Sequence, residues 1–154
     1  MSDPQAGILA PIPPLARYLC FLHKAEADPR AVLRDLRGVI DGERAVLGLG
    51  LSLVLALGGR IEGLRSFPRH VGPGFEVPST PAALGCWLRG EDRGDLIHLA
   101  HRIADIAAPA FDLDEVIDGF RHGTGLDLTG YEDGTENPKG ENAAAAALVA
   151  GGAA

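Results

Sequence analysis

Hydrophobic residues along the chain recur with two spacings, which predict short strands alternating with two helices. Compact runs of aromatic and apolar residues predict strands over 17–23, over 83–89 and in the first part of 45–57, with 53–57 turning helical. Apolar residues spaced three or four apart predict a helix over 93–108. The other helix is expected between Asp28, which can cap it ahead of Pro29, and Gly42, which stops it.

The segments between these elements decide the fold class. The proline-rich stretch 4–14 is expected to be an extended lead-in, and 58–81 is expected to be loop. Residues 111–122 fit a helix by spacing and a strand by length and position. Counting them as a strand gives the order βαββαβ, an α+β, ferredoxin-like antiparallel sheet with helices on one face. In that order the first and third strands are neighbours, which allows Cys20 and Cys86 to lie close together; we expect thiols rather than a disulfide.

Composition and charge exclude several classes of function. The chain has 154 residues, 46% of them hydrophobic, and a net charge of −7. Such an acidic chain is a poor ligand for nucleic acid or for an anionic membrane surface. The apolar run 47–57 is shorter than the roughly 20 residues of a bilayer span, and the N-terminus lacks a secretory signal pattern. We expect an acidic cytoplasmic protein without membrane or nucleic-acid partners.

The most distinctive segment is 127–140, DLTGYEDGTENPKG. Asp133-Gly134 and Asn137-Pro138 are turn-forming pairs. For an arbitrary loop of this composition, the simplest interpretation is a solvated turn whose carboxylates have no chemical role. The residues alone leave that alternative open.

This segment resembles the GxxDG stretch of dye-decolourising (DyP-type) haem peroxidases, which commonly continues with Thr-Glu-Asn-Pro. Gly130, Asp133 and Gly134 satisfy the pattern and 135–138 satisfies the continuation. Further stretches are similar to successive pieces of the same family, in the same order and over nearly the whole chain: 47–68, 77–94 and 108–130. The resemblance is to the N-terminal, distal half of the family fold and to its bacterial cytoplasmic branch.

The resemblance implies a haem-dependent peroxidase that uses hydrogen peroxide to oxidise dyes, phenols or other small aromatic reductants, with haem b as cofactor. It implies that Asp133 is the general base that takes a proton from one peroxide oxygen and returns it to the other. Gly130 and Gly134 would let the backbone turn close to the macrocycle. The implied haem-contacting residues are Gly130, Glu132, Gly134, Thr135, Glu136 and Asn137.

The resemblance also implies an incomplete site. In the family, the histidine that ligates iron and a distal arginine belong to a second ferredoxin-like half, and neither motif occurs here. We therefore expect a half-domain over 1–123, followed over 124–154 by the distal loop and a truncated Ala/Gly-rich tail. Such a chain should bind haem poorly alone and should form a homo-oligomer or associate with a C-terminal half. The alternative is a non-catalytic ferredoxin-like module that self-associates or pairs with a partner half.

Other chemistry-bearing residues are expected to have ordinary roles. His98 and His101, three apart on the second helix, lie outside its apolar stripe and are expected on a solvated face. His122 precedes the loop, where a surface or hydrogen-bonding role is favoured over iron ligation. Trp87, the only tryptophan, is expected to be a core aromatic on a strand, although an indole can also carry an oxidising hole.

Overall fold

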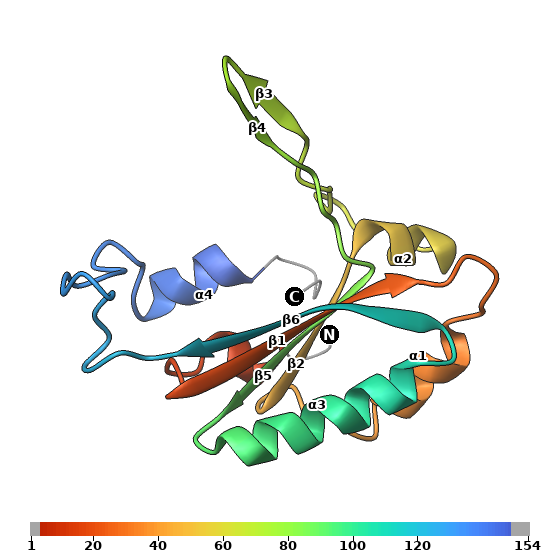
Figure 1. The fold of residues 1–154 in the computed structure, drawn as a ribbon, viewed down its shortest axis with the longest axis horizontal. Coiled ribbons are helices and arrows are strands. Elements are labelled where there is room, and N and C mark those ends of the chain that lie inside the picture. Colours follow the sequence, from red (N-terminus) through yellow and green to blue (C-terminus); the bar gives the residue numbers. More distant parts are fainter. Residues whose placement is uncertain (1–3, 149–154) are drawn as a thin grey trace.

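A computed structural model, which describes residues 4–148, contains a four-stranded sheet with helices packed against one of its faces (Figure 1). The strands of this sheet are β1 (Leu15–His23), β2 (Ala45–Leu49), β5 (Leu84–Gly90) and β6 (Phe111–Phe120). The helices are α1 (Arg30–Leu36), α2 (Leu51–Ala56), α3 (Arg93–Ala107) and α4 (Glu141–Ala147). A short 3₁₀ turn, η1, spans Ala6–Ile8, and a separate hairpin pairs β3 (His70–Gly72) with β4 (Phe75–Val77).

The main sheet has the order β2-β5-β1-β6, and every neighbouring pair is antiparallel. With α1 and α3 as the two connecting helices, this is the ferredoxin-like α+β fold that the sequence predicts. The ambiguous segment 111–122 is a strand over most of its length, because β6 pairs with β1 from Leu15↔Phe120 to His23↔Phe111. Backbone pairing with β1 therefore overrides the helix-like spacing of its apolar residues.

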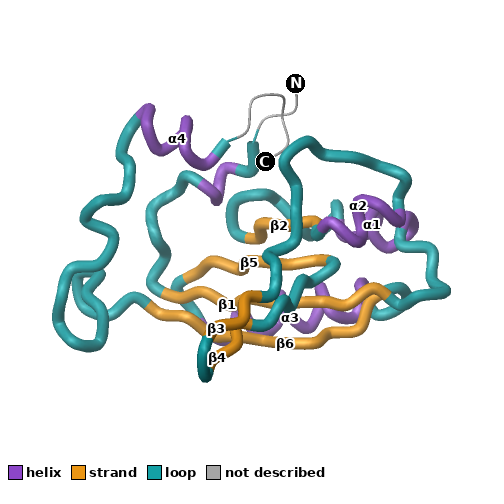
Figure 2. Tube along the Cα trace, turned by 90° about the horizontal axis from the view of Figure 1, so that it is seen from above, coloured by secondary structure: helices purple, strands orange, loops and turns teal. Residues whose placement is uncertain are grey.

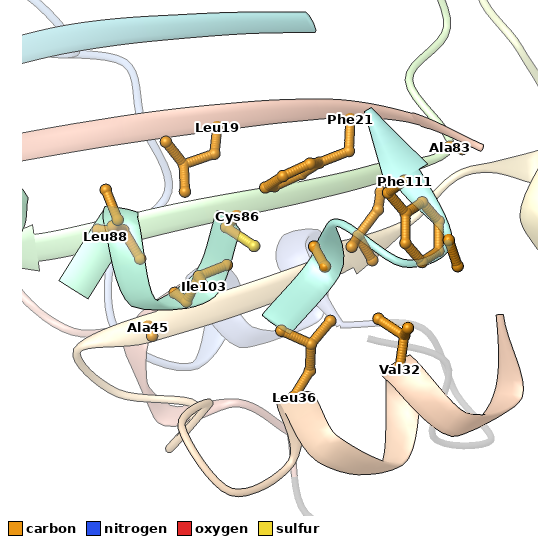
Figure 3. Packing of buried hydrophobic residues seen from close by; sticks show 14 of the residues in the cluster. Leu19, Phe21, Val32, Leu36, Ala45, Ala83, Cys86, Leu88, Ile103 and Phe111 are labelled. Carbon is orange, nitrogen blue, oxygen red and sulfur yellow. The ribbon is translucent and has the colours of Figure 1, made fainter. Parts of the chain in front are cut away.

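The hydrophobic core lies between the sheet and the helices α1 and α3 (Figure 3). Alternate residues of β1 and β5 point into it, as the two-residue period of a strand requires. The spacing of apolar residues on α3 places one face of that helix against the sheet, as predicted. The largest fully buried side chains are Leu19, Phe21, Leu36, Leu53, Leu84, Leu88, Ile103 and Phe111.

The two cysteines lie on neighbouring strands and remain thiols, as predicted. Leu19 of β1 is the register partner of Cys86, so Cys20 projects from the opposite face of the sheet. Burial raises the pKa of the Cys86 thiol to about 12. Burial, followed by the charges of Glu115 and Asp114, also raises the pKa of Cys20, which is half-buried.

The lead-in to β1 is more ordered than the expected extended segment. The Gln5 amide donates to the Leu47 carbonyl and accepts from the Leu47 N–H, each at 2.8 Å, so it extends the hydrogen bonding of β2. Gly7 then packs against β2 at a point where a Cβ would lie 2.6 Å from Val46 Cγ2. The buried guanidinium of Arg89 donates to the carbonyls of Gly7 and Pro11. These contacts turn part of the segment into η1.

Helix α1 ends at Leu36, earlier than the predicted stop at Gly42. The N–H groups of Val39 and Ile40 both donate to the Leu36 carbonyl, at 3.0 and 2.9 Å, so the chain continues as turns. Both side chains still pack against the core, which preserves the apolar spacing without a helix. Gly42 takes a positive φ of 74° in the turn before β2.

The segment 58–81, expected to be loop, contains the β3–β4 hairpin, which projects away from the main sheet in Figure 1 and lies over its strands in the view of Figure 2. Pro73 and Gly74 connect its strands, and Gly74 takes a φ of 77°, as such tight turns require. The Arg69 guanidinium forms two hydrogen bonds to Glu76 across the hairpin, at 2.6 and 2.7 Å.

The Ala-rich part of the predicted tail forms the short helix α4. The predicted tail also includes 149–154, which lie outside the described residues. Of the helices that the structure describes, none is long and apolar enough to cross a membrane.

Candidate functional site

The GxxDG loop follows directly from β6 and is attached to the sheet at its start. The Arg121 N–H donates to the Pro14 carbonyl at 2.9 Å, which continues the pairing between β6 and the segment before β1. Two isolated antiparallel bridges, His122↔Leu126 and Leu126↔Glu132, then fold the chain back on itself. The loop therefore has its own backbone hydrogen bonding.

Asp127 organises the turn that carries the motif. One of its carboxylate oxygens accepts from Thr129 Oγ1 at 2.7 Å and from the N–H groups of Thr129 and Tyr131 at 2.9 and 3.1 Å. Its own N–H donates to the Tyr131 carbonyl at 2.9 Å. The Thr129 hydroxyl and then the Tyr131 N–H hold the pKa of the Asp127 carboxyl below its ordinary value.

The organising role of Asp127 was missed from the sequence. An aspartate two residues before a threonine is the signal that could have indicated it, because Asp side chains commonly accept from the backbone two residues on. The turn closes around Gly130, whose φ is 92°. Gly134 has a φ of 69°, and a Cβ there would lie 2.5 Å from Asn137 Nδ2. Both glycines are therefore favoured by backbone conformation, and a side chain at position 134 would also displace the Asn137 side chain.

Asp133 lies on the solvent-exposed part of this loop. Its Oδ1 accepts from the Gly134 N–H at 2.7 Å. Within the described part of the chain, Oδ2 has no hydrogen-bond partner, so it is available to an external proton donor. The side chain lines a cavity of about 690 Å³, which is open to solvent.

The cavity has apolar, acidic and basic walls. Its lining residues are Ile12, Phe120, Arg121, His122, Thr124, Gly125, Leu126, Asp127, Asp133, Gly134 and Asn137. The structure thus brings together three residues of the predicted site: Asp133, Gly134 and Asn137. The others lie on the same loop but outside the lining: Gly130, Glu132, Thr135 and Glu136.

Several lining residues were not identified from the sequence. Phe120 and Arg121 stand at the end of β6, directly before the motif, and their proximity to it was a usable signal. Ile12 comes from the N-terminal segment, more than a hundred residues before the loop, and only the fold reveals its place. His122 lines the cavity, whereas His98 and His101 are exposed on α3, as expected.

An adjoining groove extends from the cavity to the face of the sheet that α1 and α3 leave uncovered. A groove of about 150 Å³ shares Ile12, Phe120 and Arg121 with the cavity and is also lined by Tyr18 and Trp87. The Tyr18 and Trp87 rings stack with centroids 6.1 Å apart. On β5, Cys86 and Leu88 point into the core, so Trp87 between them points to the open face, where it is half-buried. The expectation of a core aromatic is therefore wrong.

Curated proteins similar to this chain are dye-decolorizing peroxidases. No family model matches the chain. The dye-decolorizing peroxidase of Mycobacterium tuberculosis is 31% identical over 157 residues, which cover 92% of this chain and 46% of that protein. That of Mycolicibacterium paratuberculosis is 32% identical over 155 residues, which cover 92% of this chain and 44% of that protein.

Solved structures show the same relationship. A Shewanella oneidensis protein assigned to the DyP type superposes with a TM-score of 0.80 at 26% identity, covering 94% of this chain and 52% of that one. A variant of DypB from Rhodococcus jostii in complex with haem superposes with a TM-score of 0.77 at 26% identity, covering 92% and 50%. The chain spans about half the length of the relatives it matches. The matches cover nearly the whole chain in sequence and in fold, which supports its assignment as the N-terminal half of a DyP-type peroxidase.

Proposed function

We propose that this chain supplies the distal half of a haem-dependent peroxidase site, with Asp133 as its acid–base residue. The observation that carries the proposal is the position of Asp133. It lies on a loop that two glycines and Asp127 hold in shape, and its carboxylate lines a cavity with apolar walls. The family relationship supplies the cofactor, haem b, and the oxidant, hydrogen peroxide. Small aromatic molecules such as dyes or phenols are the proposed reductants.

The residues around the cavity fit a haem on one side. Ile12, Phe120 and Leu126 offer an apolar wall for a macrocycle, and the volume is within the range of small-molecule sites, about 300–1,000 Å³. Haem iron needs an axial protein ligand to set its electronic properties. As the family resemblance implies, we assign this ligand to a second, C-terminal half, and we expect the chain alone to bind haem poorly.

The chemistry assigned to this chain is proton transfer. Bound haem supplies the redox chemistry with hydrogen peroxide. Asp133 Oδ2, which is not used in the loop, accepts the proton of one peroxide oxygen and then donates it to the other, which departs as water. Gly134 holds Oδ1 through its N–H, so the carboxylate keeps one orientation during both transfers. Thr135, Glu136 and Asn137 continue the same loop and are proposed to form the wall at the haem edge, with Glu132 beside them.

The test adds the missing axial nitrogen from solution. The chain is mixed with hemin and 2-methylimidazole, and the visible spectrum and peroxide-dependent dye oxidation are recorded. We expect a defined Soret band and oxidation above the protein-free background, with little of either when 2-methylimidazole is omitted. D133N should return the rate to background. D105N, an exposed carboxylate on α3, is the matched control and should keep the wild-type rate. Equal rates for D133N and D105N would reject the proposed role of Asp133.

A non-catalytic module that associates through its open face is the second candidate. The observation in its favour is the apolar surface on that face: Tyr18, Leu22 and Ile117 are 40%, 44% and 47% exposed. The occupant would be a second copy or a C-terminal half. Sedimentation of the chain over a range of concentrations distinguishes a dimer from a monomer, and I117D should abolish any dimer. A dimer that leaves hemin in its free form would favour this candidate.

A further inference from the structure

One basic side chain that lines the cavity, Arg121, has no ion-pair partner among the described residues. Arg121 follows β6 and lines the Asp133 cavity. In the described residues, its guanidinium forms no ion pair and no side-chain hydrogen bond; only its backbone N–H is bonded, to Pro14. Neighbouring arginines behave differently: Arg17 and Arg93 both pair with Asp118, at 2.8 and 3.1 Å. An arginine remains charged at any ordinary pH, so the exposed Arg121 brings a positive charge to a cavity that Asp127 and Asp133 also line.

Among the described residues, neither of the two acidic residues that line the cavity forms an ion pair with Arg121. Asp127 accepts three hydrogen bonds within its own turn, and Asp133 accepts from Gly134. The Arg121 guanidinium is therefore held in place neither by these two carboxylates nor by a side-chain hydrogen bond to β6. Its five N–H groups form a planar fork that matches a carboxylate or phosphate group.

The residues around Arg121 favour an apolar ligand that bears a negatively charged group. Ile12 and Phe120, which flank it in both the cavity and the groove, are 71% and 65% exposed. Large apolar side chains that gather around a concave surface indicate a ligand or partner site. A free phosphate or a sugar phosphate would leave these two side chains without contacts. A flat apolar ligand with a carboxylate at its edge would use both features.

We propose that Arg121 is the carboxylate anchor of a porphyrin site. Its guanidinium binds a propionate group while Ile12 and Phe120 contact the macrocycle. This rests on the haem assignment of the proposed function and adds to it the residue that sets the orientation of the macrocycle relative to Asp133. Arg121 is a binding residue in this role, and it takes no part in the proton transfer.

The test uses metal-free protoporphyrin IX, because its binding needs no axial ligand and is read without enzyme activity. Affinity is measured by porphyrin fluorescence and by quenching of Trp87, which lines the adjoining groove. The same titration with protoporphyrin IX dimethyl ester removes both carboxylates and keeps the macrocycle. We expect R121Q to weaken protoporphyrin IX binding about tenfold or more and to leave binding of the diester unchanged, since a hydrogen-bonded ion pair is lost only for the free acid.

Matched variants separate this role from general effects. R102Q removes an exposed arginine on α3, across the sheet from the cavity, and should leave both affinities at the wild-type values. R121K keeps the charge without the planar fork and should fall between wild type and R121Q. Circular dichroism of R121Q checks the fold. The proposal is overturned if R121Q binds protoporphyrin IX as wild type does, if it weakens acid and diester equally, or if neither porphyrin binds saturably.

A smaller aromatic acid could also use an arginine beside apolar side chains, so 2-naphthoate is titrated in parallel. Binding of 2-naphthoate that matches or exceeds that of the porphyrin and depends on Arg121 would assign the carboxylate site to a small substrate and overturn the porphyrin assignment. Failure of the anchor remains distinguishable from failure of the proposed function. A D133N-sensitive dye oxidation alongside an R121Q variant with normal porphyrin affinity would reject the anchor alone.

Discussion

The two faces of the main sheet differ sharply in what covers them. On the face toward α1 and α3, Leu19 and Phe21 are each 1% exposed, whereas Tyr18 and Leu22, on the same strand, are 40% and 44% exposed on the open face. Successive side chains of β1 thus point alternately into the buried core and to the solvent-exposed face of the sheet. The cavity with Asp133 adjoins the open side. The covered face accounts for stability, and the open side accounts for the proposed binding and chemistry.

The largest expected effect comes from neighbouring substitutions on β1. F21A removes a ring from the sealed core and should lower the free energy of unfolding by about 3–5 kcal/mol. L22A, one position along on the open face, should cost far less because its side chain is already half in water. Urea titrations followed by circular dichroism measure both. Equal losses would show that the open face is also sealed, for example by association.

The two cysteines allow the two faces of the sheet to be compared by their chemical reactivity. Because the pKa of Cys86 is raised to about 12, its reactive thiolate is scarce at pH 8, and the side chain is buried as well. The pKa of Cys20 is raised as well, but this thiol is half-buried on the open face and should react with iodoacetamide faster than Cys86. Mass spectrometry of C20S and C86S at several times gives each rate. Comparable labelling of both thiols in the folded chain would contradict the assigned faces.

A smaller, local effect is expected in the loop. D127A removes the acceptor for the Thr129 and Tyr131 N–H groups, so hydrogen exchange of the Tyr131 amide should accelerate while the urea midpoint stays unchanged. The folded-state pKa of Asp127 is depressed, so its carboxylate orders the loop above the unfolded pKa of about 3.9. That ordering should be lost as the pH falls through the lowered folded-state pKa.

Amide NMR spectra recorded over that pH range follow the transition residue by residue. D105A is the control, because Asp105 is exposed on α3 and outside the loop. A D127A variant with unchanged exchange at Tyr131 would remove Asp127 from its organising role.

The smallest effect is expected in the projecting hairpin. Arg69 and Glu76 form a bidentate pair there, and the Arg69 guanidinium lowers the pKa of Glu76. Both side chains are exposed, and exposed ion pairs contribute little to stability. E76Q should therefore leave the thermal midpoint within error of wild type. A clear drop would show that the hairpin is coupled to the body of the molecule.

The sequence predicted features that local pattern determines. The strand and helix order, the pairing of the two strands that carry the cysteines and the apolar face of α3 were confirmed, although the two thiols lie on opposite faces of the sheet. Boundaries that depend on tertiary contacts were missed, such as the early end of α1, where Val39 and Ile40 pack without a helix. The hairpin was missed because Pro73-Gly74 was taken as loop rather than as a two-residue connection between strands.

The residues of the candidate site also fall into those that local sequence predicts and those that only the tertiary structure brings together. The motif predicted Asp133 and its glycines because these residues are adjacent in sequence. The apolar wall combines Ile12 with Phe120, which meet only after β1 and β6 have paired, and no local pattern connects them. The roles of Asp127 and Arg121 depend on which polar groups find partners in the fold, which spacing alone does not determine.

The most direct test of the account is the second-order rate constant for the reaction of hydrogen peroxide with the complex of chain, hemin and 2-methylimidazole, followed by stopped-flow absorbance. This step isolates the proton transfer assigned to Asp133 from dye binding. The account predicts that D133N lowers the rate constant by about 10²–10⁴, the usual contribution of general acid–base catalysis, while D105N leaves it unchanged. A D133N complex that forms normally and reacts at the wild-type rate would contradict it.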